Sequence, residues 1–347
     1  MRICQVVAGY GEGGLEKHVR ELSAELADAG HAVSVLGDRR LLDTLPKPVR
    51  QVPVPIHLGR RNPLLLLELL AKLRACRCEV IHAQASKAAA LMALLKPWLP
   101  CPVVGTLHNV KHDLRAFGKL DHVITVSREL ARAFSPERVS VIYNGIEAAT
   151  PASVDLRKAF DLPADRPVLC AVGRLVHAKG FDVLLDAIDG LPVSLVIAGE
   201  GAARPALERR IARLAPVTQV RLPGHWDAAR SLMAAADATI IASRREGFSY
   251  VCAEALQCGA RLVSTDVPVA NEMLPPGLIV PVGDAAALRG KLQTLLADPA
   301  AWDEALRTPR RQAERLMSRQ TMRAHTCVVY AGLIALRTER VSLKTPD

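Results

Sequence analysis

The chain has 347 residues, half of them hydrophobic and only 3% aromatic, and a formal net charge of +10. This length predicts two domains with aliphatic cores. The positive charge favours anionic partners such as nucleotide phosphates or acidic lipid, while the scarcity of aromatic residues argues against stacking on nucleic-acid bases. The eight cysteines include no C-x-x-C pair, which argues against a zinc site and favours reduced thiols in the cytoplasm. There is no apolar run of about 18 residues, as a membrane span requires, and we expect no secretory signal before the strand 2–8.

The first predicted unit is a strand, a glycine-rich loop and a helix. A strand over 2–8 precedes a helix over 15–29 and a second strand over 32–36; the loop contains Gly9, Gly11, Gly13 and Gly14. Glycines let the backbone approach a ligand, and amides at a helix start favour phosphate. Gly9, Gly11 and Gly14 satisfy G-x-G-x-x-G, and Asp38 follows the second strand. An NAD-dependent oxidoreductase is therefore one hypothesis, and a tight turn without a ligand is another.

Residues 39–77 are basic and rich in leucine. They hold nine Lys/Arg, namely Arg39, Arg40, Lys47, Arg50, Arg60, Arg61, Lys72, Arg74 and Arg77, against Asp43 and Glu68. Residues 62–74 predict a helix with Pro63 at its first position. A basic, leucine-rich helix can lie on an anionic membrane surface. The alternative is a helix packed on the core whose charges stay in water.

An alternation of strands and helices continues to residue 145. Strands are predicted over 79–82, 102–108, 121–127 and 139–144, with helices over 87–96 and 128–134. His108 closes the second of these strands. Because ligands bind at the carboxyl ends of parallel strands, His108 is a candidate site residue, although a purely structural histidine fits equally well.

The opening pattern then returns. After a linker over 148–167, a strand leads to Gly173 and Arg174, and Lys179 precedes a helix over 181–188 and a strand over 195–199. Two cations flanking a loop at a helix start can bind a diphosphate, or can simply be solvated charges. A second Rossmann-like domain is therefore predicted.

Two glutamates stand eight positions apart in the stretch 246–254. Glu246 follows the strand 238–243 in a loop, and Glu254 lies inside the helix that ends before Gly259. Amides at a helix start favour phosphate, and a carboxylate can hold sugar hydroxyls. This pattern suggests a nucleotide-sugar; the alternative is two solvated glutamates.

Ordered motifs give the chain its resemblance to a family. They are Gly13-Gly14 with Glu16-Lys17-His18, Val80-Ile-His82, Thr106-Leu-His108, Val126-Ser127, Val141-Ile-Tyr-Asn144-Gly145, Gly173-Arg174 with Lys179-Gly180, Ala198-Gly-Glu-Gly201, Leu222-Pro-Gly224, Glu246-Gly-Phe-Ser249 with Glu254-Ala-Leu256, Cys258-Gly259, Ser264-Thr-Asp266 and Val280-Pro-Val-Gly-Asp284. In this order the chain resembles the retaining glycosyltransferases of family 4, which have the GT-B fold. The resemblance implies an α/β protein with two Rossmann-like parallel-sheet domains facing across a cleft.

The resemblance also implies roles for single residues. Gly13, Gly14 and Gly173 would approach the donor, Arg174 and Lys179 would bind its diphosphate, Glu246 with Gly247, Phe248 and Ser249 would hold its sugar, Glu254 would bind the ribose, Gly224 and His225 would border the base, and His108 would lie beside the reacting sugar. The catalytic set is then His108, Arg174, Lys179 and Glu246. No cofactor or metal is expected, since no D-x-D triplet occurs; the donor is a co-substrate, with UDP favoured over GDP.

The expected partners are that donor, a glycan or glycolipid acceptor of a bacterial envelope such as lipopolysaccharide, and an anionic membrane surface. We expect a cytoplasmic enzyme, peripheral on the inner face of the membrane. The predicted division is an acceptor-side domain over 1–148, a linker over 149–164, a donor domain over 165–318 and a terminal segment over 319–347 whose helix crosses back. The sequence departs from the family pattern at Asn109 and in 267–272, which lacks glycines. A non-catalytic nucleotide-binding homologue is the third hypothesis.

Overall fold

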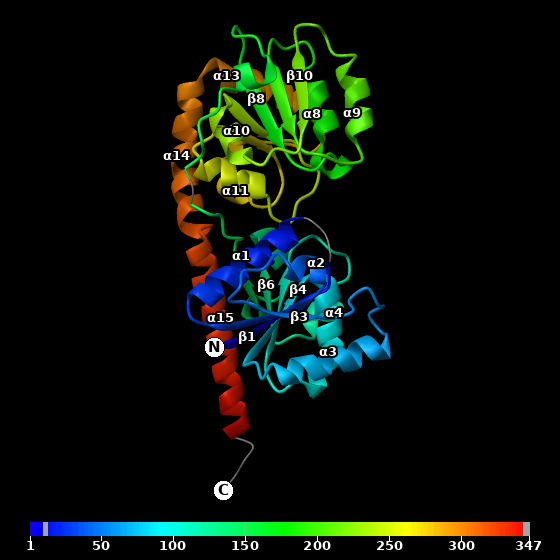
Figure 1. Ribbon diagram of the computed structural model, residues 1–347. Coiled ribbons are helices and arrows are strands. Elements are labelled where there is room, and N and C mark those ends of the chain that lie inside the picture. The colour runs from blue at the N-terminus through cyan, green and yellow to red at the C-terminus, as the bar shows by residue number, and fades with distance from the viewer. Residues whose placement is uncertain (10–12, 149, 343–347) are drawn as a thin grey trace. The chain divides into compact units, whose positions relative to one another are not determined.

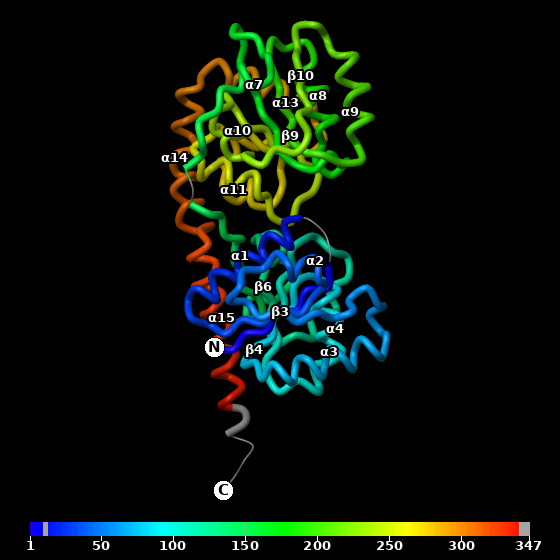
Figure 2. The backbone as a smooth tube through the Cα atoms, viewed as in Figure 1, coloured from blue at the N-terminus to red at the C-terminus, as the bar shows by residue number. Residues whose placement is uncertain are grey.

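The computed structural model describes residues 1–9, 13–148 and 150–342, without the side chains of 340–342. The chain forms two compact units (Figure 1). The first comprises Met1–Gly145 and Ser318–Asp347, and the second comprises Ile146–Met317. The described residues 150–164 of the predicted linker therefore belong to the second unit, and α15 (Arg319–Ser342) belongs to the first. Figure 2 traces this return of the backbone from the second unit to the first.

The first unit is built on a seven-stranded parallel sheet in the order β3-β2-β1-β4-β5-β6-β7. Its strands are β1 (Arg2–Val7), β2 (Ala32–Gly37), β3 (Arg50–Pro53), β4 (Val80–Gln84), β5 (Val103–Leu107), β6 (His122–Thr125) and β7 (Val139–Val141). The strand order reverses between β1 and β4, so the loops after these two strands diverge. Such a reversal is where open α/β sheets bind ligands.

Helices cover this sheet, as parallel strands require. They are α1 (Gly14–Asp28), α2 (Arg39–Leu42), α3 (Pro63–Ala75), α4 (Ala85–Leu95), α5 (Arg115–Gly118), α6 (Arg128–Ala131) and α15 (Arg319–Ser342), with 3-10 turns η1 (Lys96–Trp98) and η2 (Pro136–Arg138). The last helix is part of the core: Met322 and Tyr330 of α15 are buried with Val19 and Leu22 of α1. Gly145 lies so close to Arg319 that an added Cβ would meet the Arg319 Cα at 2.6 Å.

The second unit repeats the plan with six parallel strands in the order β10-β9-β8-β11-β12-β13. They are β8 (Val168–Val172), β9 (Ser194–Ala198), β10 (Gln219–Gly224), β11 (Ala238–Ile241), β12 (Leu262–Thr265) and β13 (Ile279–Val280). Here the order reverses between β8 and β11. The loops that carry Arg174 and Glu246 follow these two strands, so both lie at the expected ligand-binding edge.

The helices of the second unit are α7 (Leu156–Phe160), α8 (Phe181–Ile188), α9 (Arg204–Ile211), α10 (Ala229–Ala235), α11 (Tyr250–Gln257), α12 (Ala270–Met273), α13 (Ala285–Ala297) and α14 (Pro299–Leu316), with 3-10 turns η3 (His177–Lys179) and η4 (Pro276–Leu278). Periodicity alone did not identify α13 and α14. Asp284 and Asp298 cap their first turns with side-chain hydrogen bonds and are the signal that could have located them.

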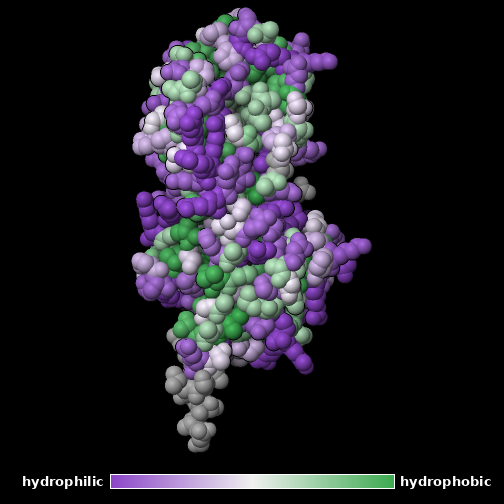
Figure 3. Space-filling model, turned by 90° about the vertical axis from the view of Figure 1, so that its left-hand side faces the viewer, coloured by the Kyte–Doolittle hydropathy of each residue, from purple (hydrophilic) through white to green (hydrophobic). Residues whose placement is uncertain are grey.

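Part of the surface of the first unit is hydrophobic. Figure 3 shows hydrophobic residues gathered on the face of the first unit that it displays. On α15 of that unit, Val328 is 71% and Leu336 is 55% exposed. Among the described residues, none of the helices is both long enough and apolar enough to cross a membrane.

Candidate functional site

Three glycines bring the carboxyl ends of β8, β9 and β10 together. An added Cβ at Gly199 would lie 1.9 Å from the Gly173 carbonyl oxygen, and the Gly199 N–H donates to the Gly224 carbonyl at 2.7 Å. Gly173 and Gly224 also have positive φ values, of 151° and 87°. Only glycine combines this close approach with that backbone conformation at low cost. The carboxyl ends of these three strands are therefore held close together by glycine backbone packing.

An ion pair joins the loops that follow β8 and β11. Lys179 Nζ lies 2.5 Å from Glu246 Oε1, and the Ser243 hydroxyl donates to the same oxygen at 2.7 Å. Glu246 is 9% exposed and the Lys179 side chain 21%. A carboxylate this buried needs such partners, because its desolvation is costly. The sequence had assigned Lys179 to phosphate and Glu246 to sugar; the structure places the two in direct contact.

A second ion pair fixes the spacing of these loops. The Arg244 guanidinium donates two hydrogen bonds to the Asp182 carboxylate, at 2.7 and 2.8 Å, and thereby lowers the pKa of Asp182. The Arg244 N–H donates to the Ala178 carbonyl at 2.8 Å. Gly180, with φ of 64°, lies against Ala242 so closely that a Cβ would be 2.0 Å from its carbonyl oxygen. The position of Lys179 beside Glu246 thus follows from backbone packing as well as from charge.

The other predicted cation is differently placed. Arg174 is exposed and has no ion-pair partner within the described part of the chain. It can therefore turn to an incoming anion, whereas Lys179 is already shared with a carboxylate. His225 is also exposed, and its Nε2 lies 3.1 Å from Asp227 Oδ1. Gly224 precedes it at the end of β10.

The start of α11 brings further predicted residues to the same edge. Gly247, Phe248 and Ser249 are buried, and the Ser249 hydroxyl accepts a hydrogen bond from the Cys252 N–H as the helix cap. Glu254 is the fifth residue of α11, and it is half-buried. In the segment 267–272, which lacks glycines, Val269 has a φ of 74°, in the positive range that glycine favours.

In the first unit, the predicted residues lie around the reversal between β1 and β4. Gly13 and Gly14 begin α1 and are exposed, while Gly11 and residues 10 and 12 lie outside the described residues. His108 follows β5. Its ring packs against that of His18 at a centroid distance of 4.7 Å, and its Nε2 lies 2.8 Å from Gln84 Oε1. Asp38, which the oxidoreductase hypothesis needs for a ribose, caps α2 through the Arg40 N–H.

Both units match models of glycosyltransferases. Residues 12–150 match the family described as Glycosyltransferase Family 4, and residues 166–298 match Glycosyl transferases group 1. The lipopolysaccharide core biosynthesis glycosyltransferase LpsE of Rhizobium meliloti is 30% identical over 243 residues, which cover 68% of this chain and 70% of that protein. The chain belongs to this glycosyltransferase family. A glycogen synthase of Mycobacterium tuberculosis is 29% identical over 94% of the chain and 92% of its own length.

Solved structures show the same fold as this glycosyltransferase. Anabaena Alr3699/HepE in complex with UDP matches with a TM-score of 0.83 and 22% identity, over 96% of this chain and all of that one. The same protein with UDP-glucose matches with a TM-score of 0.80 and 22% identity, over 95% of this chain and 99% of that one. The predicted α/β fold of GT-B type, with two Rossmann-like parallel-sheet domains, is confirmed.

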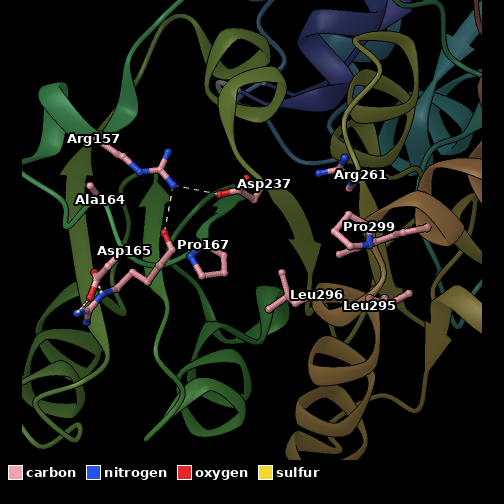
Figure 4. A pocket seen from close by; sticks show the side chains of 11 residues that line it. Arg157, Ala164, Asp165, Pro167, Asp237, Arg261, Leu295, Leu296 and Pro299 are labelled. Carbon is pink, nitrogen blue, oxygen red and sulfur yellow. Dashed lines mark hydrogen bonds and ion pairs between the residues drawn. The ribbon is translucent and has the colours of Figure 1, made fainter.

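A cavity in the glycosyltransferase's second unit lies away from these loops. It has a volume of about 320 Å³ and opens near the amino ends of β8, β11 and β12 (Figure 4). Its arginines are engaged: Arg157 lies 3.6 Å from Asp237, and Arg261 lies 2.7 Å from Asp303. Because these cations are already paired with carboxylates, this cavity is a poor anion site. Among the described residues, no cluster of three or more His, Cys, Asp or Glu could hold a metal ion.

Sequence reasoning missed several polar residues near the predicted sites. Ser243 and Arg244 lie two and three residues after the end of β11, and Gln84 closes β4, so the rule that strand carboxyl ends carry ligands would have selected all three. Gln5 is a fully buried amide in a strand whose other buried residues are apolar. A polar residue in such a strand indicates a hydrogen-bonding role, since it must find a partner there.

Proposed function

We propose that this glycosyltransferase moves a sugar from a nucleoside-diphosphate sugar to a glycan or glycolipid of a bacterial envelope, such as lipopolysaccharide. The transfer retains the anomeric configuration, needs no catalytic metal and uses a UDP-sugar in preference to a GDP-sugar. LpsE, named for lipopolysaccharide core biosynthesis, supports the acceptor class, and the UDP and UDP-glucose complexes of Alr3699/HepE support the donor class.

The observation that carries this proposal is the meeting of Lys179, Glu246 and Ser243 at the strand-order reversal of the second unit. A diphosphate at this edge would meet Lys179 from one loop and exposed Arg174 from the same loop's start. Glu246 would accept hydrogen bonds from sugar hydroxyls. Two positive charges and loop amides then stabilise the charge that grows on the leaving diphosphate, which is how a fixed polar site lowers a barrier.

The remaining predicted residues complete the proposed site. Glu254 would bind ribose hydroxyls, His225 and Gly224 would border the base, and Gly13 with Gly14 would contribute amides from the first unit. The leaving phosphate would take the acceptor proton. These roles follow the family resemblance, residue by residue.

The test of the proposed function is turnover of a panel of UDP- and GDP-sugars with lipid-linked acceptors. Proton NMR of the product gives the anomeric configuration. Arg174→Ala and Lys179→Ala should each lower kcat by about 100-fold or more, since each removes charge stabilisation in the transition state. Arg213→Ala, an exposed arginine of the same unit, is the control. Wild-type kcat in both site variants would contradict the assignment. Nucleotide binding without turnover of any donor would favour the non-catalytic homologue.

We also propose that the enzyme is cytoplasmic and docks on the inner face of the membrane through α3. Leu65, Leu69 and Leu73 of this helix are buried, but Leu64 is 69% and Leu67 is 65% exposed. Arg60 and Arg61 are exposed just before it. Exposed leucines beside cations match an anionic lipid surface. Lys72 does not contribute, because it pairs with Glu68 and donates to the Pro53 carbonyl.

Co-sedimentation with vesicles of phosphatidylglycerol tests this docking. The wild type should bind at low salt and dissociate at about 0.5 M salt, where charges are screened. Arg60→Glu with Arg61→Glu should abolish binding and spare hydrolysis of a soluble donor. Arg209→Glu with Arg213→Glu makes the same charge change on exposed positions of the second unit and should bind normally. A wild type that ignores these vesicles refutes the docking.

A further inference from the structure

A chain of buried hydrogen bonds leads through the first unit to His108. Gln5 Nε2 of β1 donates to the Ser23 hydroxyl of α1 at 2.8 Å, and Gln84 Nε2 of β4 donates to Gln5 Oε1 at 2.7 Å. Gln84 Oε1 then lies 2.8 Å from His108 Nε2. Ser23 and Gln5 are completely buried and Gln84 is 1% exposed. Strands β1, β4 and β5 are neighbours in the sheet, so this series of hydrogen bonds runs directly across it.

This arrangement determines which nitrogen of His108 carries its hydrogen. A carboxamide oxygen only accepts, so Gln84 Oε1 requires a hydrogen on His108 Nε2. The ring is neutral, because burial and the nearby imidazoles of His18 and His82 lower the pKa of His108 well below its usual range. A neutral ring with its hydrogen on Nε2 leaves a lone pair on Nδ1. The structure gives His108 Nδ1 no hydrogen-bond partner among the residues that it describes.

The contacts of His82 bear on the direction of this series of hydrogen bonds. Turning both amides together would reverse every bond and move the His108 hydrogen to Nδ1. The Nδ1 atom of His82 lies 2.6 Å from the Tyr330 hydroxyl and 3.5 Å from Gln84 Nε2. Its Nε2 lies 2.5 Å from the Thr106 hydroxyl. When the Tyr330 phenol donates to His82 Nδ1, the Gln84 NH₂ faces a lone pair and a turned amide would place its oxygen there, so this tautomer of His82 favours the direction described above.

We propose that Gln84 is a positioning residue that holds His108 as its neutral Nε2–H tautomer, so that Nδ1 accepts a hydrogen bond from a hydroxyl of the donor sugar. The sugar contact rests on the function proposed above; the tautomer does not. Gln84 touches no reacting atom in this arrangement. It acts through the imidazole, and its own amide donates to Gln5 Oε1.

Long-range proton–nitrogen NMR of protein with ¹⁵N-labelled histidine tests the tautomer directly. The His108 signal, assigned by its loss in His108→Asn, should show the Nε2–H form in the wild type. Gln84→Met keeps the length of the side chain but removes the acceptor, and should give a mixture of tautomers. An Nδ1–H ring in the wild type, or an unchanged tautomer in Gln84→Met, overturns the proposal.

Kinetics separates positioning from general damage. Gln84→Met should lower kcat about 10- to 100-fold, because a misplaced group costs that much, and should leave the Kd of free UDP within about twofold. Gln84→Glu restores an acceptor. It should recover the Nε2–H form and kcat at high pH, with the acidic limb of the pH profile moved upward because a carboxylate stabilises the protonated ring. Recovery without that shift, or equal losses in the two variants, counts against positioning.

Ser140→Ala is the matched control. Ser140 lies 2.9 Å from His122 Nε2 in the same sheet, so the variant removes a histidine hydrogen bond away from His108. It should change neither the His108 signal nor kcat. If the NMR results hold but the wild type turns over no nucleotide-sugar, the proposed function fails and the tautomer assignment stands.

Discussion

The buried histidines of the first unit make its stability sensitive to mild acid. Burial lowers the pKa of His18 to about 4 and, with the His18 ring adding to the effect, that of His82 to about 3. An unfolded histidine takes its proton near pH 6.5. Between about pH 6.5 and pH 4 the unfolded chain therefore binds more protons than the folded one, so stability falls as pH falls through this window.

The loss can be worked out from these values. From pH 7 to pH 5, each histidine that stays neutral in the fold lowers the free energy of unfolding by about 2 kcal/mol. His18 and His82 together therefore lower it by about 4 kcal/mol. Such a loss is a large fraction of the 5–15 kcal/mol typical of a whole domain. Carboxylates add little above pH 5, because their unfolded pKa values lie near or below about 4.3.

Hydrogen exchange of β4 and β5, corrected for intrinsic rates, measures opening of this unit alone. That restriction is needed because the two units need not unfold together. The His18→Leu variant should lose about 2 kcal/mol of the pH 7-to-5 drop. His57→Gln, which removes an exposed histidine of the same unit, should keep the full drop. If His18→Leu shows the wild-type drop, the imidazole is protonated inside the fold and the reasoning is refuted.

Three further predictions concern the donor site. Glu254→Ala should mainly weaken the binding of free nucleotide, measured by calorimetry. Glu246→Ala should mainly lower kcat with the full donor, measured by initial rates, because free nucleotide lacks the sugar. Equal losses of nucleotide affinity in the two variants would contradict this split. Activity should survive excess EDTA; loss on chelation that magnesium or manganese restores would overturn metal independence. Gly180→Ala should destabilise the second unit by about 3 kcal/mol and abolish donor binding. The added Cβ would clash with the Ala242 carbonyl oxygen, and residue 180 has a positive φ that alanine adopts only at a cost. Gly259→Ala is the control, because Gly259 also has a positive φ, of 76°, but no atom lies within 4 Å of an added Cβ. Equal thermal shifts in the two variants would argue against the close approach of Gly180 to Ala242.

Most of the strands and the helices α1, α3, α4, α8 and α11 were predictable from periodicity because each is specified locally, whereas β3, α13 and α14 were not assigned. The positions of Glu246 in a loop and Glu254 inside the following helix could be predicted from the strand 238–243 before them and from Gly259 after them. The contact between Lys179 and Glu246 could not, because it joins residues 67 positions apart through the pairing of β8 with β11. The chain from Gln5 to His108 was hidden for the same reason: each link comes from a different strand. Local pattern thus gives the elements, while sheet order decides which side chains meet.

The return of the chain to its first unit has a consequence for synthesis on the ribosome. The core of that unit includes Met322 and Tyr330, which are made only after the 172 residues of Ile146–Met317. At 5–20 residues per second, this delay is roughly 10–30 s. During it, the apolar side chains of α1 that α15 will cover have no partner, and synthesis of the second unit is complete before α15 is made. The domain that is translated first is therefore the one that finishes folding last. A nascent chain released before residue 318 would expose that surface permanently, and would be a substrate for chaperones and proteases.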